Sequence, residues 1–432
     1  MSDVVVAGGG VIGLCVAEAL QRRGAEVTLI EAGRCGALAS SGNGGWITPG
    51  LCTPLSAPGT MRQALRWMLR ADSPLLVRPS VRPDFLRWSV DFARNTSVRR
   101  YRAGVAALAP LGDITLDAFD ELQDEGVSFE MHADGLLFAA TSIAQRNDEL
   151  RVLHHLQDFG YNGHVELLNA AEARGLEPAL GDAIVGGILA ADERHVRPET
   201  LTAGLVAHLR ASGTTIMEQA PVTGLAREGS QWRLELDGGD SVRGRKVVVA
   251  AGVATSALLA PLGVRLPLQG AKGYSVTDAE PALRPIRPLY LLEAKVGVSP
   301  FAGGVRLAGT LELGSRDPSL NRRRLDALDA AAARYLDGWR PGRERREWAG
   351  FRPTLPDGLP AIGPVTGHDG LFVATGHQML GVTLAPATAK ILAPAVLDGG
   401  RSLELVPFSP DRFEDRFVMT PRVPEGAARA RT

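Results

Sequence analysis

Runs of apolar residues at the start of the chain predict a strand, a helix and a second strand in close succession. Residues 4–7 are apolar throughout, as in a strand that is buried on both faces of a sheet. Residues 14–23 are helix-like, and residues 26–30 have the length and composition of a short strand. This order predicts a βαβ unit that binds a dinucleotide.

The turn between the first strand and the helix has the sequence GGGVIG, and three of its glycines have a structural role. Gly8 permits the tight turn, Gly10 lets the backbone approach a pyrophosphate, and Gly13 lets the helix pack on the strand. The diphosphate would sit on the positive helix N-terminus. Glu31 closes the second strand, where it can accept hydrogen bonds from ribose hydroxyls and disfavour a 2′-phosphate. FAD or NAD is therefore expected rather than NADP.

Later patterns predict an insertion followed by a return to the nucleotide-binding domain. Residues 40–50 form a loop rich in small residues, residues 60–100 and 105–125 have the spacing of helices, and residues 128–140 resemble a hairpin through Asp134 and Gly135. A helix then begins at Arg197, with Pro in its first turn. The strands expected after it lie near Val222, at 231–236 and at 246–251, and the last of them ends at Gly252.

A further strand, turn and helix follow near the end of the chain. Residues 371–377 and Gly381 precede an Ala-rich helix, whose N-terminus would offer a positive dipole to an anion. Arg352 stands between the bulky Phe351 and the rigid Pro353, so its guanidinium is expected to be held in place. An anion-binding role and a structural salt bridge both remain open at this point.

Composition sets the outer limits. The 432 residues, 45% of them hydrophobic, predict two domains, and a net charge of −1 gives no electrostatic footprint for nucleic acid. No apolar stretch has the length of a transmembrane segment, and the first strand begins too early for a signal peptide, so a cytoplasmic protein is expected. The three cysteines lack metal-site spacing; neither metal nor disulfide is expected, and Cys15 reads as a core residue.

These motifs together resemble the FAD-dependent D-amino-acid oxidase superfamily. The matching segments are GGGVIG with Glu31, SSGNGGWITPG, VVVAAG, GFRPTLPDGLPAIGP and LFVATGHQMLG. Residues 40–110 look most like bacterial D-amino acid dehydrogenases, and glycine and sarcosine oxidases are relatives. The resemblance implies FAD, and an α/β (α+β) chain with a glutathione-reductase-like Rossmann domain and an antiparallel-sheet substrate domain. The expected FAD-binding domain spans 1–60, 195–258 and 350–432, and the expected substrate domain spans 61–194 and 259–349.

The resemblance also implies which residues contact FAD. Sarcosine oxidases attach their flavin to a cysteine near the position of Gly350, and no cysteine stands there, so non-covalent FAD is expected. His377 is expected to be a cofactor or packing residue rather than an acid–base catalyst. The residues expected to bind the cofactor are Gly8, Gly10, Val11, Ile12, Gly13, Glu31, Ala32, Ser40, Ser41, Asn43, Gly44, Gly45, Val222, Ala251, Gly252, Gly376, His377 and Gly381.

The implied activity is oxidation of the carbon–nitrogen bond of a D-amino acid, glycine or an N-substituted glycine. Hydride transfer to the flavin would give an imine that hydrolyses, and oxygen or a quinone would reoxidise the flavin. Arg352 would clamp the substrate carboxylate, and Tyr274 and Thr48 are further expected substrate contacts. The alternative is a flavin-binding subunit of a larger electron-transfer or interaction assembly.

Overall fold

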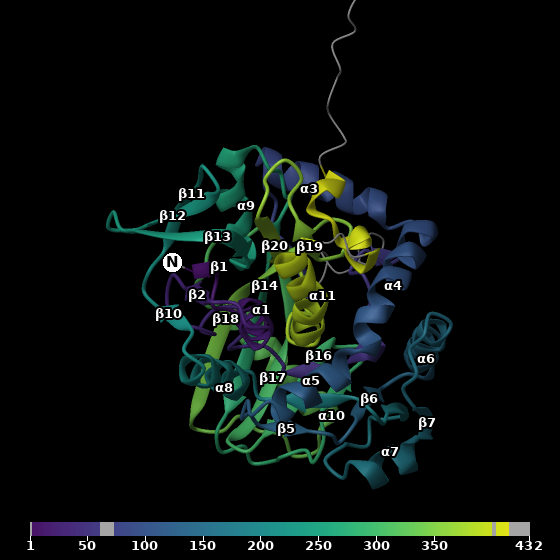
Figure 1. Ribbon diagram of the computed structural model, residues 1–432. Helices are drawn as coiled ribbons and strands as arrows, with labels where there is room; N and C mark the ends of the chain where they lie inside the picture. Colours follow the sequence, from purple (N-terminus) through teal and green to yellow (C-terminus); the bar gives the residue numbers. More distant parts are fainter. Residues whose placement is uncertain (1, 61–72, 400–402, 414–432) are drawn as a thin grey trace, which may run out of the picture.

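The computed structural model describes residues 2–60, 73–399 and 403–413 of the chain (Figure 1). Its first sheet has eight strands that come from three separate stretches of sequence. Four of them run in the order β10-β2-β1-β13, β20 lies parallel to β13, and β19 pairs with β20. The strands are β1 (Ser2–Ala7), β2 (Val27–Ile30), β10 (Thr215–Met217), β11 (Val222–Glu228), β12 (Gln231–Leu236), β13 (Ser241–Val249), β19 (Ala361–Pro364) and β20 (Leu371–Thr375).

Both faces of this sheet are buried, as the apolar run at residues 4–7 predicts. Val4 and Val6 pack into one core, whereas Val5 and Ala7 pack into another. Helix α1 (Val11–Arg22) and helix α11 (Ala385–Asp398) lie side by side over the sheet in Figure 1 and pack against each other. The predicted βαβ unit is therefore present.

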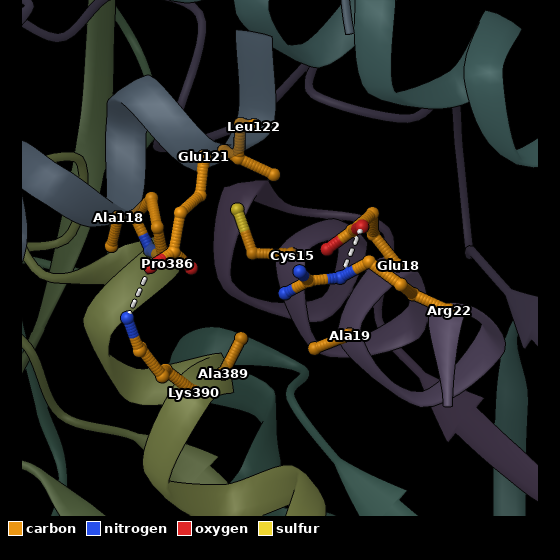
Figure 2. A pocket seen from close by; sticks show the side chains of 10 residues that line it. All are labelled: Cys15, Glu18, Ala19, Arg22, Ala118, Glu121, Leu122, Pro386, Ala389 and Lys390. Carbon is orange, nitrogen blue, oxygen red and sulfur yellow. Dashed lines mark hydrogen bonds and ion pairs between the residues drawn. The ribbon is translucent and has the colours of Figure 1, made fainter. Parts of the chain in front are cut away.

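The hollow in Figure 2 shows how closely α1, α11 and α5 (Thr115–Asp124) pack. Its volume is about 10 Å³, which leaves room for about one water molecule. Cys15 lines it and is fully buried, and the ion pairs Glu18–Arg22 and Glu121–Lys390 flank it. Cys15 is thus a core residue, as predicted.

The second sheet has nine strands and is mainly antiparallel. Its order is β18-β14-β17-β16-β15-β6-β8-β7, with β4 beside β17. Helix α10 (Arg322–Tyr335) packs on one of its faces. The strands are β4 (Leu75–Val77), β6 (Leu136–Ala140), β7 (Val165–Asn169), β8 (Gly186–Ala190), β14 (Gln269–Asp278), β15 (Leu289–Leu291), β16 (Val296–Phe301), β17 (Gly304–Leu313) and β18 (Arg345–Thr354).

A third, small sheet joins β3 (Trp46–Ile47), β9 (Arg194–Val196) and β5 (Met131–His132). Within the described ranges, no helix is both long and apolar enough to cross a membrane. The remaining helices lie between strands in the sequence. They are α3 (Pro83–Asn95), α4 (Val98–Asp113), α6 (Ile143–Gln157), α7 (Ala170–Leu176), α8 (Pro198–Ala211) and α9 (Thr255–Leu259), with short 3₁₀ turns η1 (Pro49–Leu51), η2 (Gly252–Ala254), η3 (Ala260–Leu262), η4 (Leu403–Phe408) and η5 (Pro410–Phe413).

Four expectations from the sequence need correction or fall partly outside the described residues. The helix expected at 105–125 is two helices, α4 and α5, which meet at Ile114. The hairpin expected at 128–140 is wrong, because β5 and β6 lie in different sheets. The domain boundary expected at residue 350 divides β18, all of which belongs to the second sheet. Part of the helical region expected at 60–100, residues 61–72, lies outside the described residues.

Candidate functional site

The glycine turn after β1 is built for close backbone contacts. Gly8 has a φ of 119°, and a Cβ atom on it would lie 2.4 Å from the carbonyl oxygen of Ala250. A Cβ on Gly13 would lie 1.9 Å from the carbonyl oxygen of Gly8. Neither position can hold a side chain without moving backbone, so the turn stays open at the carboxyl ends of β1 and β13. Ala251 and Gly252 follow β13 at the same edge.

The N-terminus of α1 carries the positive end of the helix dipole toward this turn. Gly10 caps the helix without a side-chain hydrogen bond, and no acidic residue lies in the first turn, which contains Val11, Ile12 and Gly13. The amide of Val11 donates to Oγ of Ser40 over 3.0 Å. A helix end without a carboxylate is suited to an external anion, so the residues present fit the diphosphate of a dinucleotide.

Glu31 lies beside the same turn and is held there by backbone donors. Its Oε2 accepts from the amide of Gly9 over 2.7 Å, and its Oε1 accepts from the amide of Gly33 over 2.9 Å. The residue is only 8% exposed. The amide of Ala220 donates to the carbonyl of Glu31, which brings the start of β11 at Val222 to this end of the sheet, as expected for an adenosine site. Ala32 follows Glu31 directly.

The loop after β2 is fixed by a buried arginine that the sequence analysis missed. Nη1 of Arg306 donates to the carbonyls of Ser41 and Asn43 over 3.0 and 2.8 Å. Its Nη2 lies 2.5 Å from a carboxylate oxygen of Glu199, and its Nε donates to Thr277. Arg306 therefore ties β17 to the expected flavin loop, and no local motif announces a contact made across so much sequence.

Further contacts give this loop a defined shape. The carbonyl of Gly44 accepts from the Ser299 hydroxyl over 2.7 Å, and Oδ1 of Asn43 accepts from the amide of Gly45 over 2.8 Å. Gly45 has a φ of 77°, and a Cβ there would lie 2.0 Å from the carbonyl of Val196. The cofactor residues expected between 40 and 45 are thus held as a unit, and the carbonyls of Ser41, Asn43 and Gly44 bond to side chains of the second sheet.

Arg352 lies on β18, on the face of the second sheet that this loop meets. Opposed residues of an antiparallel pair share a face, so Arg352 shares its face with its partner Ala271. A Cβ on Gly273 would lie 1.9 Å from Nη1 of Arg352, which shows that the guanidinium lies over that glycine. Its nearest hydrogen-bond acceptor is the carbonyl of Thr310, at 3.5 Å.

The guanidinium of Arg352 has no charge partner in the described part of the chain. Burial alone lowers its pKa to about 10, so it remains protonated at neutral pH. The side chain is partly buried, and a partly desolvated cation without a carboxylate occurs where a ligand supplies the missing charge. This arrangement favours anion binding over the structural salt bridge, which the sequence left open.

Tyr274 was expected beside Arg352, and the structure corrects that expectation. Tyr274 is opposite Ala349 on β18, so it points to the other face of the sheet, because neighbouring positions along a strand alternate. Its hydroxyl donates to Glu312 over 2.9 Å, and the residue is fully buried in the core beneath α10. Tyr274 therefore cannot contact a ligand held by Arg352.

The junction before α11 closes the other side of the site. Gly376 has a φ of 83°. His377 follows it and is buried, with Nε2 3.0 Å from the hydroxyl of Thr388, and burial lowers its pKa to about 3. His377 is therefore a neutral packing residue. Gly381 lies next to it, and a Cβ there would lie 3.9 Å from that of His377.

Two threonines connect this junction to the rest of the site. Thr383 donates to the carbonyl of Trp46 over 2.8 Å and accepts from the amide of Thr48 over 3.4 Å. Thr375 donates to the carbonyl of Gly252 over 3.0 Å. Thr48 is thus placed at the turn that precedes α11, among the expected cofactor residues.

A second functional candidate that the sequence analysis missed is Glu193, which anchors the turn after Thr48. Its Oε1 accepts from the amide of Gly50 and from the hydroxyl of Tyr161, each over 2.8 Å. The side chain is buried, and burial raises its pKa to about 8. Nothing in the local sequence marks it, because its partners lie far away along the chain.

The chain is similar in sequence to a known protein family and to named relatives. The FAD dependent oxidoreductase family matches residues 3–395. The D-amino acid dehydrogenase of Xanthobacter autotrophicus is 31% identical over 93% of this chain and 96% of its own length, and that of Phenylobacterium zucineum is 32% identical over 94% and 96%.

Solved structures share the fold. Glycine oxidase from Geobacillus kaustophilus matches with a TM-score of 0.72 and 24% identity, over 95% of this chain and 98% of its own. Iminodiacetate oxidase from Chelativorans matches with a TM-score of 0.70 and 22% identity, over 94% and 98%. The glycine turn, the uncapped helix and the matched length agree: the chain belongs to the family of FAD-dependent oxidoreductases.

Proposed function

We propose that this flavoenzyme oxidises the carbon–nitrogen bond of an amino acid, with D-amino acids, glycine and N-substituted glycines as the substrate class. The observation that carries the proposal is the partly buried guanidinium of Arg352, which has no charge partner in the described part of the chain. A substrate carboxylate supplies the charge that the protein does not. The names of the dehydrogenase relatives point to the same class of substrate.

Arg352 orients the substrate by donating two parallel N–H hydrogen bonds to its carboxylate. Because the guanidinium lies over Gly273, the substrate carboxylate binds in one orientation. The substrate thus loses orientational freedom before the reaction, which raises the rate. When bound, FAD supplies the acceptor for the hydride. The N-terminal end of α11 offers a positive dipole on the opposite side of the site.

The reaction needs a neutral amine rather than a dedicated base. The substrate loses a hydride from the carbon that carries nitrogen and a proton from the nitrogen to solvent, so a carbon–nitrogen double bond forms. Water then hydrolyses the imine to a keto acid and ammonia, or to an amine and an aldehyde acid. His377 takes no part in this scheme, because it is buried against Thr388.

The electron acceptor, oxygen or a quinone, and the cytoplasmic location remain predictions from the sequence. So does the alternative, a flavin-binding subunit of a larger electron-transfer assembly. Arg352 favours catalysis, since a subunit of that kind has no need of a carboxylate-binding group at its flavin.

Anaerobic titration of the purified holoenzyme tests the proposal. A panel of D-amino acids, glycine and sarcosine should bleach the flavin absorbance with at least one member. The matched amines without a carboxylate serve as controls and should leave the spectrum unchanged. If no carboxylate-bearing amine bleaches the flavin, the subunit alternative replaces this proposal.

A further inference from the structure

A tryptophan shares the face of β18 with Arg352. Trp348 and Arg352 lie two positions to either side of Gly350, and alternate positions along a strand point to the same face. A Cβ on Gly350 would lie 2.1 Å from Cζ2 of Trp348, so the indole leans along the strand over that glycine. Gly350 is the direct partner of Gly273, over which the Arg352 guanidinium lies. The two side chains therefore converge on one pair of glycines.

The same indole also meets the expected flavin loop. A Cβ on Gly42 would lie 1.9 Å from Cδ2 of Trp348. The neighbouring positions on the same face, Ser275 and Ala308, are small, and both side chains are buried or partly buried. Trp348 itself is partly exposed. It thus forms a large apolar wall that spans from the flavin loop to the carboxylate-binding arginine.

We propose that Trp348 is the wall against which the substituent of the substrate packs, and that it sets a preference for small apolar amino acids. The proposal rests on the function proposed above. The reacting carbon is one bond from the carboxylate that Arg352 holds, so its substituent has to share the space over Gly350 and Gly273 with the indole. A charged substituent would meet an apolar ring there and lose its hydration without compensation.

The size of the effect follows from ordinary pocket discrimination. One methylene more or less in a hydrophobic pocket changes kcat/KM by roughly 10- to 200-fold. Removing the indole should therefore relax the limit on substituent size while it weakens the fit of small substrates. A residue with only a packing role would change activity toward all substrates in the same proportion.

The test compares Trp348→Ala and Trp348→Phe with Trp339→Phe, which removes an indole from the core that contains Tyr274 on the other face of the sheet. The substrates are D-alanine, D-valine and D-phenylalanine. We expect Trp348→Ala to raise the kcat/KM ratio of D-phenylalanine to D-alanine by about tenfold or more. Trp348→Phe, which preserves an aromatic wall, should give a smaller increase, and Trp339→Phe should leave the ratio unchanged.

A binding measurement tests this inference separately from the proposed function on which it rests. Acetate and benzoate are titrated into each holoenzyme, and the change in the flavin spectrum gives a Kd for each carboxylate. Trp348→Ala should shift the ratio of the two constants toward benzoate, even if no amino acid reduces the flavin. An unchanged ratio in Trp348→Ala, or loss of FAD from both Trp348 variants, would overturn the role of Trp348. Absence of flavin reduction in the parent would overturn the proposed function alone.

Discussion

At the scale of single residues, the buried Arg306 and the partly buried Arg352 differ in what surrounds them. Arg306 has the carboxylate of Glu199 and three oxygen acceptors, and the charge of Glu199 opposes the lowering of its pKa by burial. Arg352 has neither a carboxylate nor a short hydrogen bond within the described residues. A partly desolvated cation without a counter-charge favours an anionic ligand, whereas Arg306 already has its counter-charge in the protein. We therefore expect a structural role for Arg306 and a ligand-binding role for Arg352.

Glu31→Gln should weaken FAD retention and leave substrate preference unchanged. The carboxylate lies at the glycine turn of the first sheet, bound to the amides of Gly9 and Gly33, whereas Arg352 lies on β18 of the second sheet. Losing a charge-assisted hydrogen bond costs about 1.5–3 kcal/mol, or roughly ten- to a hundredfold in affinity. The effect is measured by dialysis against buffer without FAD and by the Kd for FAD rebinding. Parental FAD affinity in the variant would show that Glu31 is not the ribose ligand.

At the scale of elements, the sequence predicts what depends on local pattern. The strand expected at 231–236 is β12, residue for residue, and the helix that begins after Arg197 is α8. Both have apolar spacing or a proline that acts within a few residues. The expected hairpin fails because β5 pairs with β9 and β6 pairs with β8 and β15, which are choices made over long distances.

Some residues of the candidate site could likewise be predicted from the sequence, and others could not. The glycine turn, Glu31 and Arg352 stand in recognisable motifs; the first two lie together at the carboxyl end of β1, whereas Arg352 lies on β18 of the second sheet, outside the domain expected for it. The face to which Tyr274 points could not be read from the sequence, because it depends on which side of the sheet α10 covers. Arg306 and Glu193 had no signal, since their partners are distant in sequence.

Glu193 should make the stability of the turn at Gly50 depend on pH. Its folded pKa of about 8 lies above the ordinary value of 4.5, because of burial. The folded protein therefore binds more protons between these values, and the free energy of unfolding falls as pH rises from about 4.5 to about 8. Each pKa unit corresponds to about 1.4 kcal/mol, so the total is on the order of a few kcal/mol.

Glu193→Gln is the matched control, because an amide keeps the acceptor for Gly50 and Tyr161 without titrating. Melting temperatures across this pH range should fall more steeply with rising pH for the parent than for the variant. Equal slopes in the two proteins would show that Glu193 does not titrate there.

At the scale of the whole molecule, the two large sheets meet where the glycine turn, the loop at 40–45 and β18 lie together. Arg306 reaches from the second sheet to the loop of the first, and Thr383 connects the junction before α11 to Trp46. Correcting the boundary at 350 matters here, since it assigns Arg352 to the second sheet rather than to the first.

FAD should leave the denatured protein. Covalent attachment through sulfur requires a reactive thiolate, and burial raises the pKa of all three cysteine thiols, to about 12 for Cys35. Acid precipitation should release the flavin to the supernatant, and a denaturing gel should show no fluorescent band. Flavin that stays with the polypeptide would contradict the prediction.

The most direct test of the account is the rate of anaerobic flavin reduction in Arg352→Ala and Arg352→Lys, measured against substrate concentration in holoenzyme of known flavin content. Truncating one partner of a buried charge pair costs about 2–5 kcal/mol, so kcat/KM for reduction should fall by about a hundredfold or more in Arg352→Ala. Arg352→Lys should recover only part of the loss, because an ammonium cannot form the planar fork. FAD should remain bound in both variants. Reduction at nearly the parental rate in Arg352→Ala would contradict the carboxylate-binding role of Arg352 and the assignment of an amino acid substrate.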